Sequence, residues 1–451
     1  MDEPADVREA IRMNGARILY AAAVLTHSSL LAAAERRVPA DYATIQQAIT
    51  ASVDGDDVVV ASGRYVECVV VSGKNVVLRS SQGAAATIID GNGQCPVVRI
   101  DAGVARTMRV QGFTITGGYS AMDAGGIQID WSSPTIRDNV IVDNRGGGHG
   151  NGISSFYSGP LIVGNHIARN VNTFTSFGGG GAGGIGVNLT RCFDQQQTRD
   201  CAAEIYANLI EDNAVDAYTQ GGGITVSGEN ARVVGNVIRN NRATRAGGGI
   251  AVINGVNVVI ENNLFVGNRV TGSDGQGGAV HLDVTGAASG APFVINNTFA
   301  DNLAPTGSAI YSGGFDIAVR IVNNMIVGGS AVSPVFCATG GDAFPPIVRS
   351  NDVVADGAPP YAGRCSGSDG TLGNISVAPR FFGPGDYRLA SGSAGIDAGN
   401  NAFSGETADL AGMARIVEGD GLSGATIDMG AYELGDLLFS ESFDAAGADP
   451  H

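Results

Sequence analysis

Hydrophobic and polar residues recur along this chain in one pattern, Asn-x-[Ile/Leu/Phe]-x-x-Asn. The first asparagine of each copy is residue 139, 165, 208, 236, 263 or 297, and weaker copies lie at residues 112–115 and 324–326. Each copy predicts a short strand with one buried side chain that stacks on its counterpart in the next copy. The predicted stack consists of Ile141, Ile167, Ile210, Ile238, Phe265, Phe299 and Ile326.

A second pattern, Gly-Gly-Ile or a close variant, runs in step with the first, for example at residues 222–224 and 248–250. The interval from its isoleucine to the next pattern asparagine is 12 residues in three copies and 23 in the copy that contains Cys192 and Cys201. The excess predicts a loop closed by a disulfide. A period near 27 with two strand signals predicts an all-β fold, a right-handed parallel β-helix or solenoid. The L-x-x-L-x-L run of leucine-rich horseshoes is missing.

The pattern asparagines are interpreted as scaffold. Asparagine tolerates positive φ at turns, and a column of amides can hydrogen-bond from coil to coil. Thr44 to Gln47 read as a capping box that opens a short helix. This N-terminal capping helix is expected to cover the exposed sheet edge of the first coil, as repeat proteins require.

Residues 1–34 read as a signal peptide, with Arg17, a short apolar core and the end Ala32-Ala33-Ala34. Met13 is an alternative start, and a buried N-terminal helix is the alternative to export. No later segment has the roughly 18 apolar residues of a membrane helix.

The formal net charge of −17 and the pI near 4.6 argue against nucleic acid and anionic membranes as partners. Six cysteines permit fifteen pairings, of which local ones are favoured in an exported protein: Cys68–Cys95, Cys192–Cys201 and Cys337–Cys365. Metal-type spacing such as C-x-x-C is absent, which argues against zinc. We expect a monomer.

The run from Tyr42 to Glu67 resembles the first coil of pectin-lyase-like β-helix proteins. The segment from Asp386 to Gly399, with Asp409, Gly412, Arg415 and the ending Ile427 to Glu433, resembles the tail of bacterial choice-of-anchor surface β-helix proteins. The resemblance implies a β-helix over residues 35–375, a choice-of-anchor-like C-terminal region over 376–433 and a tail over 434–451. It also implies a bacterial protein that is secreted or held at the cell surface, and it leaves the activity open.

Strand alternation predicts two solvent-facing columns beside the Gly-Gly-Ile strands. His281, Asp283 and Tyr311 would lie within one coil of each other and could form an acid/base set, or simply a solvated polar face. Asp130 and Asn188, in the second column, are candidate ligand-binding residues.

A second candidate is the ridge of turns after the asparagine columns. Arg242 and Arg269 are candidate bases for a polysaccharide lyase, and Asp216 and Asp274 are candidate ligands for Ca²⁺. Sugar contacts are assigned to Arg245, Phe174, Phe177 and Tyr218. Mixed charge on solvated loops is the plainer interpretation.

Gly148-His149-Gly150 resembles one element of the polygalacturonase signature, but the other elements of that signature are absent from the sequence. Lys74 is the only lysine that could serve as a base, and it lies far from both candidate clusters. The leading hypothesis is therefore a secreted or surface β-helix that binds a polysaccharide, a cell-surface glycan or a partner surface. The alternative is a polysaccharide lyase or glycoside hydrolase that acts on an acidic polysaccharide.

Overall fold

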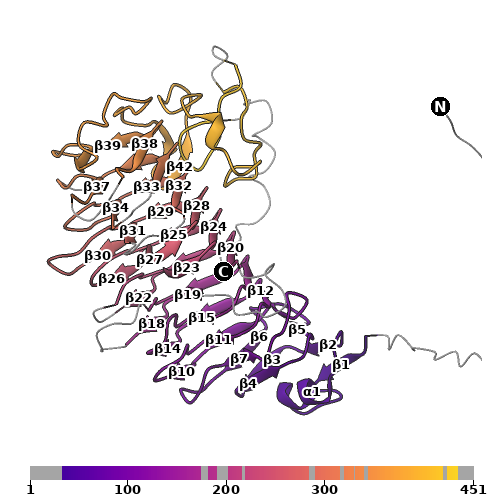
Figure 1. Cartoon of the computed structure of the whole chain (residues 1–451). Helices are drawn as coiled ribbons and strands as arrows, with labels where there is room; N and C mark the ends of the chain where they lie inside the picture. The colour runs from indigo at the N-terminus through magenta and orange to yellow at the C-terminus, as the bar shows by residue number, and fades with distance from the viewer. Residues whose placement is uncertain are drawn as a thin grey trace, which may run out of the picture. The chain divides into compact units, whose positions relative to one another are not determined.

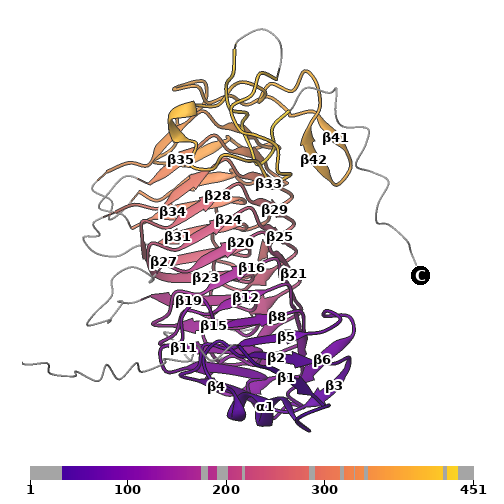
Figure 2. The same ribbon diagram turned by 90° about the vertical axis from the view of Figure 1, so that its right-hand side faces the viewer.

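The computed structural model describes residues 33–173, 181–189, 202–215, 219–283, 290–314, 319–329, 331–339, 344–419 and 424–434. In this part of the chain three long parallel sheets and one short sheet wind around a common axis (Figure 1, Figure 2). One coil runs through β12 (Thr135–Arg137), β13 (Val140–Val142), β14 (Arg145–Gly146) and β15 (Ile153–Phe156), which belong to sheets A, B, D and C in turn. The predicted parallel β-helix is confirmed.

Sheet A contains, in spatial order, β1 (Glu35–Val38), β2 (Asp57–Val60), β5 (Val77–Ser80), β8 (Arg109–Gln111), β12, β16 (Leu161–Val163), β20 (Glu204–Tyr206), β24 (Arg232–Val234), β28 (Val259–Glu261), β32 (Phe293–Ile295), β35 (Arg320–Val322) and β38 (Ile347–Arg349). Sheet B contains β3 (Gly63–Val66), β6 (Thr87–Asp90), β9 (Thr114–Thr116), β13, β17 (His166–Ala168), β21 (Leu209–Glu211), β25 (Val237–Arg239), β29 (Leu264–Val266), β33 (Thr298–Ala300), β36 (Met325–Val327) and β39 (Asp352–Val354).

Sheet C contains β4 (Val69–Ser72), β7 (Val98–Asp101), β11 (Ile127–Asp130), β15, β19 (Ile185–Leu189), β23 (Ile224–Glu229), β27 (Ile250–Val256), β31 (Val280–Asp283), β34 (Ile310–Gly313), β37 (Val335–Cys337) and β40 (Tyr361–Gly363). The short sheet D contains β10 (Tyr119–Ser120), β14, β18 (Val171–Asn172), β22 (Ala214–Val215), β26 (Arg242–Ala243) and β30 (Arg269–Val270).

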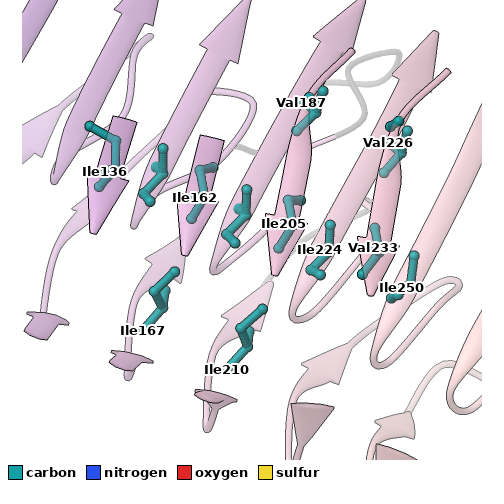
Figure 3. Packing of buried hydrophobic residues seen from close by; sticks show 14 of the residues in the cluster. Ile136, Ile162, Ile167, Val187, Ile205, Ile210, Ile224, Val226, Val233 and Ile250 are labelled. Carbon is teal, nitrogen blue, oxygen red and sulfur yellow. The ribbon is translucent and has the colours of Figure 1, made fainter. Parts of the chain in front are cut away.

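The predicted stack of buried side chains is confirmed. Ile141, Ile167, Ile210, Ile238, Phe265, Phe299 and Ile326 are register partners from coil to coil in sheet B, and each is fully buried. Figure 3 shows Ile167 and Ile210 beside side chains of sheets A and C that point into the same interior. Full burial of one such side chain contributes roughly 1.5–3 kcal/mol, so the stack is a main source of stability.

Asparagines form two continuous buried ladders. One lies at the corner between sheets A and B, from Asn139 to Asn374, and each Nδ2 donates to the Oδ1 of the next asparagine over 2.9–3.1 Å. The other runs from Asn144 to Asn302, between sheets B and D. The expected coil-to-coil amide bonding is therefore confirmed.

The expectation that the ladder asparagines have positive φ is wrong. The residue before each ladder asparagine turns the chain, for example Asp138 (φ 54°) and Asp143 (φ 58°). This turn aims the following asparagine inward, where its amide also reaches backbone carbonyls such as that of Val110.

The capping helix is α1 (Ile45–Ala51), and it closes the first coil as expected. Thr44 caps its N-terminus by accepting from the Gln47 backbone N–H, and Lys74 Nζ donates to two carbonyls at its C-terminal end. The Gln46 side chain completes the edge of β4, because its amide bonds both the N–H (2.7 Å) and the C=O (3.2 Å) of Val70. Lys74 therefore stabilises the C-terminal end of α1.

Replacing Gln46 with alanine is expected to lower the free energy of unfolding by about 1 kcal/mol and to promote self-association, because it leaves the Val70 backbone unpaired at an open sheet edge. Urea unfolding and light scattering measure both effects. The matched control is Gln47→Ala, whose exposed side chain lies on the same helix. Equal behaviour of the two variants would contradict this role for Gln46.

The two disulfides in the described residues are those expected. Cys68–Cys95 and Cys337–Cys365 each join residues one coil apart, with Cα–Cα distances of 6.2 and 5.4 Å. The third expected pair, Cys192–Cys201, lies outside the described residues. Among the described helices, none has the length and apolar character needed to cross a membrane.

The described part of residues 376–434 packs on outward side chains of sheets A and B, such as Glu261 of β28 and Thr298 of β33, which accept from the backbone N–H groups of Glu406 and Ala431. It includes the antiparallel hairpin β41 (Phe381–Gly383) and β42 (Asp386–Leu389) and the 3-10 helix η1 (Asn401–Phe403). Leu389, Ile396 and Met429 form a buried cluster with Met325 of β36. Turn residues of the solenoid add polar contacts, such as Asn323 Oδ1, which accepts from the Asn400 N–H over 2.8 Å.

A buried charge network underlies this attachment. The Arg415 guanidinium donates to Glu433 Oε1 (2.6 Å), to Asn262 Oδ1 and to the Gly430 carbonyl, and its side chain is 1% exposed. Asp428 accepts from the backbone N–H groups of Asp397 and Leu434. Arg415, Asp428 and Glu433, among the residues that carry the choice-of-anchor resemblance, thus have structural contacts here.

Candidate functional site

The first predicted solvent-facing column of sheet C is in fact buried, so the expected exposure is wrong. Gln128, Ser154, Thr225, Ala251 and His281 are each at most 4% exposed. The chain between sheets D and C folds back over this column. The Gln220 carbonyl accepts from Thr225 Oγ1, and a Cβ on Gly277 would lie 2.9 Å from the Cα of His281. The glycines before each strand are therefore needed for close approach as well as for a corner.

His281, Asp283 and Tyr311 do lie on adjacent strands, as the period predicts. The His281 ring stacks on Tyr311, with centroids 5.0 Å apart, and Tyr311 stacks on Phe336 of β37. Burial, and secondarily the charge of Arg245, lowers the pKa of His281 to about 3. The imidazole is therefore neutral and shielded by the chain, which does not suit an acid/base group that must reach a polymer.

The second candidate site, the ridge of turns after the asparagine columns, can be checked only in part. Arg242 and Arg269 are register partners in sheet D, and both side chains are exposed, as are Arg245 and Asp274. The other predicted members, Asp216, Phe174, Phe177 and Tyr218, lie outside the described residues. Within the described ranges no three His, Cys, Asp or Glu side chains gather as ligands for a metal ion.

Aromatic side chains gather at the ends of β11 and β15 in a group here termed the aromatic platform: the exposed Trp131 and the half-buried Phe156 and Tyr157. The Trp131 ring stacks on Tyr157, with centroids 4.4 Å apart and planes 21° apart, and Phe156 meets Tyr157 edge-on at 4.3 Å. Trp131 is 49% exposed. His149 stacks on Phe156 at 5.7 Å and extends the group.

The backbone at these positions makes the aromatic pair unusual. Trp131 and Tyr157 have φ of 50° and 47°, in the left-handed region that bulky residues avoid. Gly73, Ala102 and Asn254 hold the corresponding positions in other coils of sheet C, also with positive φ; Asn254 lies within β27. Two aromatic residues in successive coils thus oppose the local backbone preference, at a cost of about 1 kcal/mol each, a pattern typical of functional sites.

Polar side chains flank the platform. Asp130 Oδ1 accepts from Gln128 Nε2 (2.7 Å), while Arg99 lies 3.7 Å from Asp130 and bonds Asp101 over 3.2 Å. Burial raises the pKa of Asp130, against the lowering effects of Gln128 and Arg99. Asn188 is the register partner of Phe156, and its buried Oδ1 has no partner among the described residues. The predicted ligand residues Asp130 and Asn188 therefore both lie at this surface.

Sequence reasoning missed Trp131 and Tyr157. A signal was present, because these residues are 26 apart, the same spacing as Asn139 and Asn165, and Trp131 is the only tryptophan. The equal spacing puts the two rings in adjacent coils at the same position.

The architecture defines a protein of the parallel β-helix class. The family model described as "Right handed beta helix region" matches residues 42–272, just over half of the chain, and the chain belongs to this family. The expected likeness to right-handed β-helix proteins is thereby confirmed.

Two solved structures illustrate the likeness. The crystal structure of pectate lyase Pel9A is 15% identical with a TM-score of 0.44, and the match covers 86% of this chain and 90% of that one. Alginate lyase AlyGC of the PL6 family is 15% identical with a TM-score of 0.37, and the match covers 84% of this chain and 60% of that one. The search of curated proteins found no match.

Proposed function

We propose that this protein is an exported β-helix that binds glycans through the aromatic platform. The observation that carries the proposal is the exposed Trp131 indole, which is backed on one face by Tyr157. In the preceding coil Ala102 lies opposite Trp131, because the Gly103 N–H donates to the Trp131 carbonyl. A methyl group covers less of an indole than a second ring does, and Trp131 is 49% exposed.

This arrangement suits a sugar. The C–H face of a pyranose packs on an aromatic ring, and nearby carboxylate and amide groups accept and donate hydrogen bonds to its hydroxyls. Asp130, which directly precedes Trp131 and is held by the buried Gln128, supplies such a carboxylate. The strands beneath hold the contacts rigidly, which reduces the entropy lost on binding.

Export and surface location belong to the same proposal. Two disulfides within the described residues favour an oxidising compartment, and a signal peptide over residues 1–34 would direct the chain there. Residues 35–375 would then be the binding solenoid, and 376–433 a region that closes its last coils.

Replacing Trp131 with asparagine is expected to weaken glycan binding at least tenfold and to leave the fold intact. Asparagine occupies the equivalent left-handed position at residue 254, so the backbone accepts it. Glycan-array binding and isothermal titration measure the first effect, and thermal unfolding the second.

The matched control is Phe336→Leu, which removes a ring at the far end of the same sheet. Unchanged binding by the Trp131 variant would contradict the assignment of the site. Absence of glycan binding by the parent protein would contradict the function.

The alternative, a lyase for acidic polysaccharide, is favoured by the adjacent exposed side chains of Arg242 and Arg269. An arginine would take the proton from the carbon next to the uronate carboxyl, the glycosidic C–O bond would break, and the leaving oxygen would take up a proton. The product carries a C=C bond conjugated to the carboxylate. An increase in its ultraviolet absorbance that Arg242→Ala or Arg269→Ala abolishes would favour the lyase, and inertness toward polyuronides would exclude it.

A further inference from the structure

Acidic residues lie next to Trp131 along the chain and in the preceding coil. Asp130 directly precedes Trp131 on β11, and Asp101 directly precedes Ala102 on the neighbouring strand β7 of sheet C. The negative charge of Asp123, an exposed side chain, also raises the pKa of Asp130. Asp101 and Asp130 thus share one guanidinium, that of Arg99, and Asp123 adds a third negative charge that acts on Asp130.

Arg99 neutralises this group only in part. Its Nε is bonded to Asp101 over 3.2 Å, and its Nη2 lies 3.7 Å from Asp130 Oδ2, beyond hydrogen-bond length. The Arg99 side chain is itself 49% exposed, so solvent screens its charge. The side chain of Asp130 is 20% exposed, and it retains an oxygen that faces no close donor among the described residues.

An indole face next to partly buried carboxylates is complementary to a cation. A positive charge is attracted to the face of tryptophan more strongly than to the face of any other aromatic side chain. The same carboxylates repel a uronate, because like charges brought together at a desolvated surface cost free energy. A neutral sugar would gain the stacking contact and hydrogen bonds alone.

We propose, resting on the glycan-binding function above, that the ligand of the platform is a cationic glycan built of amino sugars with free amines. The pyranose ring packs on Trp131, and its ammonium group bonds Asp130 and Asp101. The site thereby discriminates against polyuronides and sulfated polymers.

Intrinsic fluorescence tests this proposal directly, because Trp131 is the only tryptophan of the chain. The whole protein is titrated with a β-1,4-glucosamine oligomer, with its fully N-acetylated counterpart of equal length, and with an oligogalacturonate. The pH is mildly acidic, so that the free amines are protonated. The glucosamine oligomer is expected to change the emission with an affinity about tenfold higher than the acetylated oligomer, and this preference is expected to shrink in high salt.

In the Asp130→Asn variant, the glucosamine oligomer and its N-acetylated counterpart should bind with the same affinity. The control Asp143→Asn removes an exposed carboxylate of a sheet B turn, paired there with Arg169, and should keep the preference. Equal affinity for charged and acetylated oligomers in the parent protein, or tighter binding of oligogalacturonate, overturns the cationic ligand but leaves glycan binding at Trp131 standing. No response to any of the three oligomers, together with an unreactive glycan array, overturns the glycan-binding function itself.

Discussion

Asn236→Leu is expected to lower the free energy of unfolding by about 3–5 kcal/mol, because the substitution interrupts a buried ladder of amides. Asn236 Oδ1 accepts from both the backbone N–H and the side chain of Asn208, and its Nδ2 donates to Asn263 Oδ1 and to the Ile205 carbonyl. Leucine has the same branching but is larger, and it leaves these partners unpaired in the dry interior. Urea unfolding measures the loss, and hydrogen exchange should locate it to the coils on either side.

The control for this prediction is Asn230→Gly. Asn230 is exposed at a turn with φ of 61°, which glycine adopts without strain, so a change below about 0.5 kcal/mol is expected. A loss of similar size in both variants would show that the ladder is not a special source of stability.

Arg415→Met is expected to cost about 3–5 kcal/mol and to release residues 376–434 from the solenoid, because it leaves Glu433 as a buried carboxylate without its cation. Both partners of the Arg415–Glu433 pair are almost fully buried, at 1% and 0% exposure. Proteolytic cleavage within this region and exposure of Met325 to oxidation report the release. Arg388→Met, which removes a half-exposed ion pair with Asp386, is the control and should change stability little.

The effect of Arg415→Met should depend on pH. Burial, and then the charge of Glu433, raises the pKa of Asp428 from its usual 3.8 to about 7, and burial also raises the pKa of Glu433. Between these two pKa values the folded state keeps a proton on Asp428 that the unfolded state has released. The contribution of this carboxyl group to the free energy of unfolding is therefore fully present below pH 3.8, and it is lost as the pH rises toward 7.

In the variant, Glu433 no longer has the guanidinium that lowers its pKa, so mildly acidic pH should partly restore the attachment of residues 376–434. Urea midpoints measured across pH 4–7.5 for both proteins would reveal a steeper fall in the variant. Parallel pH profiles would contradict a role for these carboxyl groups.

For the aromatic platform, the spacing of residues in the sequence predicts the position of the two rings in the coils but not their conformation or exposure. The interval from Trp131 to Tyr157 places both residues at one position of adjacent coils. The left-handed backbone conformation at that position and the 49% exposure of the indole come from the tertiary structure. Neither follows from the spacing, because the turn after each sheet C strand has no repeated sequence motif.

The sequence alone determined the solenoid, its buried column from Ile141 to Ile326, the asparagine ladders, the capping helix and the two described disulfides. The physical reason is that each coil contacts its neighbours about 27 residues away, so a periodic sequence directly reports tertiary contacts. Only the tertiary structure decided that chain segments between sheets D and C cover the first predicted surface column, and His281 with it. It also decided that Arg415 meets Asn262, 153 residues away, because contacts made once between distant segments leave no period to detect.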